Sequence, residues 1–167
     1  IDIKGCPSVR SALTSIDHEK IFRNAKYLLD LGAHVEMVYL MVTGFNDSDE
    51  CVKWVLEKHL DYLGPDTPIH INRYYPAHNW RKPSTPLRKL LMARDEARKL
   101  GINYVYVGNV GLTDLETTKC PKCGKTLIER HGYRVTYYKL DGDKCPRCGQ
   151  KVPIKGRYVP EKSLPII

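Results

Sequence analysis

The segment HVEMVYLMVTGFNDSDECVKWVLEKHL, residues 34–60, sets the fold class that the sequence predicts. Residues 34–42 are dense in Val, Met, Tyr and Leu, which is typical of a buried strand. Residues 43–48 then read Thr-Gly-Phe-Asn-Asp-Ser, a combination that favours a turn and a helix cap. The apolar residues that follow predict a helix running to about Leu60. The segment is therefore one strand-turn-helix unit.

A shorter strand and another helix precede this segment. Ile1 and Ile3 alternate with Asp2 and Lys4 as the side chains of a strand do, so the two charged residues share one face. An aspartate at position 17 and a glycine at position 32 are suited to begin and end the helix between them. The chain thus starts in the same alternation of strand and helix.

A further strand and helix, and then a final strand, follow the segment. Residues 68–75 repeat the strand pattern, Thr85-Pro86 predicts a helix cap with proline at the first helical position, and Gly101 is placed to end that helix. Residues 102–107 supply the last strand. The order β-α-β-α-β-α-β indicates an α/β fold with a parallel sheet and right-handed crossovers. Four such strands cannot close a barrel, so the sheet is either open or a severed part of one.

Two copies of one cysteine motif lie beyond these elements. The first is Cys120-Pro-Lys-Cys123-Gly and the second is Cys145-Pro-Arg-Cys148-Gly. Two residues between cysteines let both sulfur atoms of a turn face one ion, and the following glycine permits the positive φ that such a turn needs. Residues 126–138 alternate as a hairpin would. The pattern predicts a ribbon in which four thiolates hold Zn²⁺ in a tetrahedral set.

Other chemistries share this ligand set. Iron in a rubredoxin-like site or an iron–sulfur cluster also binds four thiolates, so zinc against iron stays open. Structural disulfides are disfavoured because the chain shows no secretory signal. The remaining cysteines, Cys6 and Cys51, stand alone in the sequence and are expected to be inert thiols.

The charge is concentrated in the cysteine-rich part. The chain of 167 residues carries a formal net charge of +8, and residues 116–167 hold twelve basic against five acidic groups. This surplus balances the thiolates in part and could also meet RNA or an acidic protein, although nucleic acid is the less favoured partner. No apolar run is long enough for a membrane span, so a cytoplasmic protein is expected.

Changes in composition divide the chain into an α/β part at 1–115, whose sheet is open or a severed part of a barrel, a four-cysteine zinc ribbon at 116–158 and an irregular tail at 159–167. The chain also opens in strand-like alternation without an initiator methionine. We therefore expect it to be a piece of a longer protein.

Several of these stretches together resemble one family in order along nearly the whole chain. The family is the radical SAM enzymes similar to pyruvate formate-lyase activating enzyme, and within it the AmmeMemoRadiSam-system group. The stretches are Ile1-Asp-Ile-Lys4, Gly44-Phe-Asn-Asp47, Leu63-Gly-Pro-Asp-Thr-Pro-Ile-His70, Arg73-Tyr-Tyr-Pro76, Pro83-Ser-Thr-Pro86, Tyr104-Val-Tyr-Val-Gly-Asn-Val110, and the two cysteine motifs separated by Gly132-Tyr133.

The resemblance implies a partial (β/α)6 barrel that holds a [4Fe–4S] cluster and S-adenosylmethionine. By matching position, Asp2 and Lys4 look like the pair on the fourth strand that contacts the methionyl end of that cofactor, and His70 looks like the histidine of the sixth strand. Thr43 and Gly44 lie where related enzymes approach the adenosine. The resemblance also implies an unknown substrate, possibly a protein, and a Memo-family partner.

The chain departs from the family pattern in two places. Thr43 stands before Gly44 where the family usually has proline. More importantly, the family binds its cluster through Cys-x3-Cys-x2-Cys, and none of the 167 residues has that spacing. We therefore expect the carboxyl-terminal part of a radical SAM enzyme, inactive alone. The alternative is a non-catalytic zinc-ribbon module that binds RNA or a protein partner.

Overall fold

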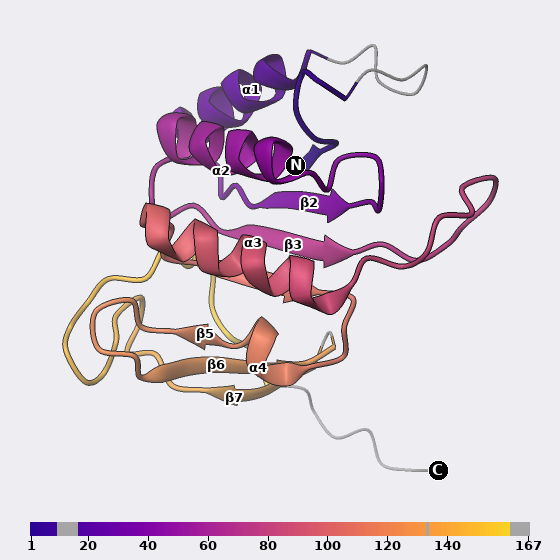
Figure 1. Ribbon diagram of the computed structural model, residues 1–167. Helices are drawn as coiled ribbons and strands as arrows, with labels where there is room; N and C mark the ends of the chain where they lie inside the picture. The colour runs from indigo at the N-terminus through magenta and orange to yellow at the C-terminus, as the bar shows by residue number, and fades with distance from the viewer. Residues whose placement is uncertain (10–16, 133, 161–167) are drawn as a thin grey trace.

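The computed structural model describes residues 1–9, 17–132 and 134–160. Strands and helices alternate over roughly the first two thirds of the chain, and the rest contains a small antiparallel sheet (Figure 1). In chain order the elements are β1 (Asp2–Ile3), α1 (His18–Asp30), β2 (Met37–Met41), α2 (Asp49–Leu63), β3 (Ile69–Arg73), α3 (Leu87–Leu100), β4 (Val105–Gly108), α4 (Thr113–Glu116), β5 (Thr118–Lys119), β6 (Thr126–His131) and β7 (Arg134–Tyr138).

The first four strands form one parallel sheet in the order β1-β2-β3-β4. The predicted α/β class and parallel sheet are confirmed. Alternate strand residues on one face belong to a single core cluster with residues of α1, α2 and α3, which all cover that face (Figure 1). The strands contribute to this core Ile3, Met37, Tyr39, Met41, Ile69, Ile71, Val105 and Val107.

All the long helices therefore lie on one side of a sheet whose strands follow in sequence order. Right-handed crossovers that always step in the same direction produce this arrangement, whereas a doubly wound sheet reverses direction and places helices on both faces. The four strands form an open parallel sheet whose three long helices cover one face.

Local sequence signals explain where the helices begin and end. The Asp17 carboxylate accepts a hydrogen bond from the Lys20 N–H, and Ser48 caps α2 in the same way. Gly101 ends α3 in the left-handed conformation that glycine adopts without strain. The expected cap at Thr85 is wrong, because Pro86 is the cap residue and makes no side-chain cap bond. The Thr85 hydroxyl instead bonds to the backbone of β2 and of the segment after β3.

The antiparallel sheet has the order β5-β6-β7, and β6 and β7 form the predicted hairpin. Its core is shared with the larger sheet, because Tyr104 and Tyr106 pack with Leu127 and Ile128 in one buried cluster. Tyr104 immediately precedes β4 and Tyr106 lies within it, and both are on the face that the long helices leave uncovered. The ribbon thus covers the β4 end of that face.

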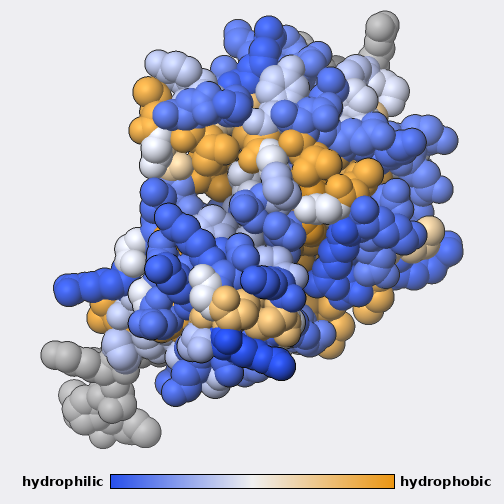
Figure 2. Space-filling view, turned by 90° about the vertical axis from the view of Figure 1, so that its left-hand side faces the viewer, coloured by the Kyte–Doolittle hydropathy of each residue, from blue (hydrophilic) through white to orange (hydrophobic). Residues whose placement is uncertain are grey.

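Two further observations concern the surface and the remaining cysteines. Figure 2 shows the side at which the parallel strands begin, where hydrophobic side chains gather in a band between hydrophilic ones. Cys6 and Cys51 form a disulfide that ties the segment after β1 to the first turn of α2, so the expectation of two inert thiols is wrong. Within the described ranges, no helix is long and apolar enough to cross a membrane.

Candidate metal centre and polar cleft

The four predicted ligands Cys120, Cys123, Cys145 and Cys148 come together in the ribbon. Their sulfur atoms all lie within 4.8 Å of one another. The Sγ atoms of Cys120 and Cys148 are 3.6 Å apart, and those of Cys123 and Cys145 are 3.7 Å apart. A tetrahedral zinc ion with Zn–S bonds of about 2.3 Å would separate its sulfur ligands by roughly 3.8 Å. The site is therefore shaped for one tetrahedral metal ion.

The two cysteine turns have the same backbone structure. In the first, the Gly124 N–H donates to the Cys120 carbonyl at 2.9 Å, and in the second the Gly149 N–H donates to the Cys145 carbonyl at 2.9 Å. The two glycines have φ of 71° and 72°, as the sequence predicted. Each pair of thiols is thus presented by a rigid turn, which reduces the conformational entropy lost when a metal binds.

Two thiols of the second turn, Cys145 and Cys148, have pKa values shifted in opposite directions. Burial raises the pKa of Cys145, but the N–H groups of Arg147 and Cys148 and the adjacent sulfurs outweigh it and lower the pKa to about 6. The N–H of Gln150 lowers the pKa of Cys148, but burial and the neighbouring sulfurs together outweigh it and raise the pKa to about 11. Four crowded thiols therefore cannot all ionise without a cation, and a divalent ion would supply the missing positive charge.

A second feature is a cleft of about 670 Å³ on the face of the parallel sheet that the long helices leave uncovered. Its floor is β3 and β4, and α4 and the end of β6 form one wall. The lining residues are Glu36, His70, Asn72, Tyr106, Gly108, Asn109, Gly111, Thr113, Glu116, Arg130, His131 and Gly132. The cleft is polar, whereas the opposite face of the same strands is the apolar core.

His70 lies in this cleft, with its ring held in place. Its Nε2 atom is 2.6 Å from one oxygen of Glu36, whose other oxygen is 2.8 Å from His34 Nε2. The ring stacks on Tyr106 with centroids 5.0 Å apart. The hydrogen bond with His70 is the main cause that lowers the pKa of Glu36 to about 2 despite partial burial. The carboxylate is ionised and fixes which ring nitrogen of His70 stays free.

Asp2 and Lys4 form an ion pair at the other edge of the same face. Asp2 and His70 occupy one row of the sheet, since both are registered with Val38 of β2. Two strand spacings of about 4.8 Å put them roughly 10 Å apart, so they face the same space without touching. Both side chains of the ion pair are nearly half exposed.

Thr43 and Gly44 follow β2 in a turn that satisfies most of its own polar groups. The Gly44 N–H donates to the Asp47 carboxylate at 2.8 Å, and the Val42 N–H donates to the Asn46 side chain at 2.6 Å. The Thr43 hydroxyl is buried and has no hydrogen-bond partner among the described residues. It is therefore the polar group of this turn that a ligand would satisfy.

The sequence did not identify Glu36, Asn72, Tyr106 or Arg130 as site residues. Alternation within residues 34–42 places Glu36 on the same face as Val38, but only the register across β2 and β3 brings it to His70. Arg130 reaches the cleft from a separate sheet. No local signal distinguishes these residues from ordinary surface side chains.

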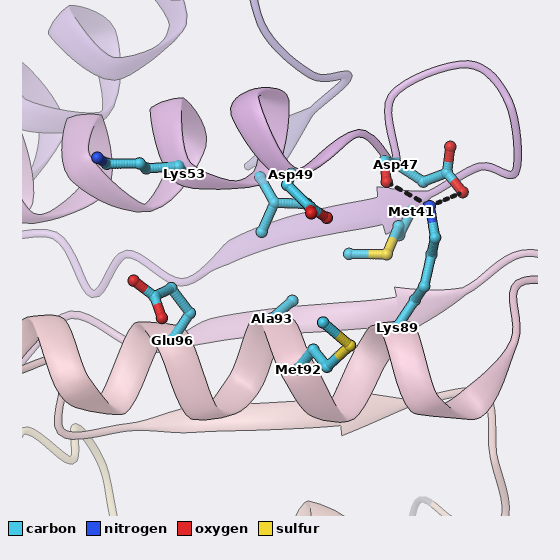
Figure 3. Close-up of a pocket in the computed structure, with 9 residues that line it drawn as sticks. Met41, Asp47, Asp49, Lys53, Lys89, Met92, Ala93 and Glu96 are labelled. Carbon is cyan, nitrogen blue, oxygen red and sulfur yellow. Dashed lines mark hydrogen bonds and ion pairs between the residues drawn. The ribbon is translucent and has the colours of Figure 1, made fainter.

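A second pocket, of about 250 Å³, lies between α2 and α3 on the helix-covered side (Figure 3). Lys89 closes one end by donating to the Asp47 carboxylate at 2.9 Å and to its carbonyl at 2.8 Å. The other side chains of this pocket are Met, Ala and Val with peripheral charges. We interpret it as an imperfect helix-helix contact, because its charged groups do not converge on one point (Figure 3).

Comparison with known proteins places few limits on function. No protein-family model matches the chain. No solved structure matches it. The chain is 35% identical over 142 residues to the uncharacterized protein MJ0808 of Methanocaldococcus jannaschii, an alignment that covers 84% of this chain. The chain spans 43% of the length of that archaeal protein, to which it is similar.

Proposed function

We propose that this chain is the carboxyl-terminal part of a radical SAM enzyme similar to pyruvate formate-lyase activating enzyme, in which the ribbon is a structural zinc module. One observation carries the proposal. The strands follow in sequence order with α1, α2 and α3 on one face, and the other face is polar and hollow. That is how the wall of a β/α barrel is built, with its chemistry on the inner face.

The free edge of the sheet supports the same proposal. In the described part of the chain β1 pairs only with β2, so its outer edge is available to another strand. Near the end of α1, Tyr27 is 65% and Leu31 is 67% exposed. Exposed apolar side chains beside an unpaired strand suit the packing of a preceding strand and helix.

The residues that the resemblance assigns to S-adenosylmethionine fit a polar ligand on this face. Asp2 and Lys4 offer opposite charges that could pair with the ammonium and carboxylate of a methionyl group. The Thr43 hydroxyl and the second ring nitrogen of His70, which have no hydrogen-bond partner in the described part of the chain, offer two further polar contacts. S-adenosylmethionine, when bound at a [4Fe–4S] cluster, supplies a 5′-deoxyadenosyl radical that abstracts hydrogen from a substrate.

The cluster itself does not fit the cysteines of this chain. Cys6 and Cys51 are joined to each other, and the other four form the ribbon site. We therefore assign no step through a cluster to these residues. In the proposal the chain's own residues bind and orient the cofactor, and the cluster ligands belong to another part of the complete protein.

The test is made on the complete reading frame, reconstituted anaerobically with iron and sulfide. We expect a Cys-x3-Cys-x2-Cys motif in it and formation of 5′-deoxyadenosine from S-adenosylmethionine with dithionite. Lys4→Ala and His70→Ala are each expected to lower that rate about tenfold or more through loss of a charge-assisted contact. Lys53→Ala, an exposed charge on the helix side, is the matched control. A reading frame without the motif would exclude the proposal.

The surplus of basic side chains on the ribbon favours one second candidate, a module that binds RNA. In that case a generic RNA would bind at physiological salt with an affinity that falls steeply as salt rises. Failure to bind at low salt would exclude this candidate and leave the enzymatic proposal untouched.

A further inference from the structure

Arg130 is the cation of the cleft wall, and the protein holds it in one place. Its Nη1 atom donates to the Glu116 carbonyl at 3.1 Å and to the Thr118 hydroxyl at 2.9 Å. The guanidinium also lies over the Tyr106 ring, with Cζ 5.9 Å from the centroid. Two hydrogen bonds and an aromatic ring thus orient the guanidinium before any ligand arrives.

The other edge of this guanidinium makes no contact of this kind with the described residues. Among the described residues, its Nε and Nη2 atoms make no hydrogen bond, and no carboxylate forms an ion pair with it. These two atoms are the edge through which arginine binds carboxylate and phosphate groups with two parallel hydrogen bonds. A half-buried cation that is tethered on one edge and unpaired on the other is suited to a ligand.

Asn72 adds a neutral donor to the same cleft. Its side-chain amide has no hydrogen-bond partner within the described ranges and packs directly on Gly108, where a Cβ atom would overlap its Oδ1 atom. A glycine at this point of β4 therefore makes room for the amide. The Glu36 carboxylate does not compete for Arg130, because it is engaged by His34 and His70.

We propose that the cleft binds the oxyanion of a small ligand, a carboxylate or a phosphate, through the free edge of Arg130 and the amide of Asn72. The proposal deepens the proposed function and rests on it for the ligand's role, which is that of a substrate group held opposite Asp2 and Lys4. The metal-bound ribbon then contributes a binding residue in addition to its structural role.

Binding is measured directly, without any turnover. The protein is titrated with acetate and, separately, with inorganic phosphate at constant ionic strength, with sodium chloride as the reference salt. The readout is the backbone amide resonances of Gly108, Gly111 and Gly132, which line the cleft. We expect saturable shifts confined to these and adjacent residues, and the tighter of the two anions identifies the ligand class.

Variants separate this site from general attraction to a basic surface. Arg130→Ala is expected to weaken binding about tenfold or more. Arg130→Lys is expected to weaken it less, because lysine keeps the positive charge but cannot form two parallel hydrogen bonds with one oxyanion. Asn72→Ala, which lies outside the ribbon, is expected to weaken binding about fivefold. Lys139→Ala removes an exposed ribbon charge outside the cleft and should leave the affinity unchanged.

Equal affinities in Arg130→Ala, Asn72→Ala and the unaltered protein would overturn the proposal, as would shifts that rise linearly with salt across many surface amides. The result is independent of the radical chemistry. If the complete protein forms 5′-deoxyadenosine but the cleft binds no anion, this site alone is refuted; if the cleft binds anions but the complete protein forms no 5′-deoxyadenosine, the enzymatic proposal alone is refuted.

Discussion

His59 on α2 should make the stability of the α/β half depend on pH. The side chain is fully buried, its Nε2 atom donates to the Thr67 carbonyl at 2.9 Å, and its Nδ1 atom has no partner among the described residues. Burial lowers its pKa from 6.5 to about 4, although the hydrogen bond to Thr67 acts in the opposite direction. A proton on Nδ1 would place an unpaired charge in the core.

The size of the effect follows from these two pKa values. The unfolded chain takes up a proton near pH 6.5 and the folded protein near pH 4, so the contribution of His59 is complete above pH 6.5 and declines as the pH falls. Proton linkage gives a loss of about 1.4 kcal/mol at pH 5.5 and about 2.5 kcal/mol at pH 4.5. Such a loss is a large share of the stability of an ordinary domain.

The assay is urea unfolding of the protein and of His59→Gln across this pH range. Glutamine keeps a donor for the Thr67 carbonyl but does not titrate, so the difference between the two proteins isolates the imidazole. His78→Asn removes an exposed imidazole, at a residue with φ of 52° that asparagine tolerates, and serves as the control. If His59→Gln loses as much free energy between pH 6.5 and 4.5 as the unaltered protein, the reasoning is refuted.

Three further changes test other parts of the structure. Cys145→Ser should abolish metal binding, measured by mass spectrometry, and raise the amide exchange rates of β6 and β7 but not those of β2. Lys122→Ser, at an exposed residue of the first cysteine turn, should do neither. Retention of the metal by Cys145→Ser would contradict the proposed site. Asn46→Ala removes three partly buried hydrogen bonds, one from the Val42 N–H and two to the carbonyls of Lys4 and Leu40, and should lower the free energy of urea unfolding by about 3 kcal/mol. A loss no larger than that of the exposed Asn79→Ala would count against this prediction. The Cys6–Cys51 disulfide links residues 45 apart in the sequence, so its reduction should lower the free energy of unfolding by about 4 kcal/mol. Alkylation of both cysteines in the unfolded protein without prior reduction would show that the bond is absent.

Local signals account for most of the elements that the sequence predicted. Caps and breakers act over one helical turn, so Asp17, Ser48 and Gly101 fix helix ends wherever the helices are packed. Thr85 is the exception, because its hydroxyl bonds to two neighbouring segments and not to the start of its own helix. A side chain with two available roles cannot be assigned from its neighbours in sequence.

For the four-cysteine site, in contrast, local sequence was sufficient. Spacing within each Cys-x-x-Cys motif and the glycine after it determine a complete half-site, which is why both turns have the same hydrogen bonds. The hairpin between the two motifs then reverses the direction of the chain and brings the second pair of sulfur atoms next to the first. Cys6 and Cys51 lack such a local motif, so only folding places them together.

The sequence by itself determined the α/β class, the parallel order of strands, the ribbon hairpin and the four cysteines that could hold a metal ion, because each follows from periodicities and spacings within a few residues. Only the tertiary structure decided the composition of the cleft. Strand register carries Glu36 to His70, close packing lays Asn72 on Gly108, and the docking of the ribbon on β4 brings Arg130 over Tyr106. These contacts join residues far apart in the chain, whose distance in space is set by the packing of whole elements and by no local preference.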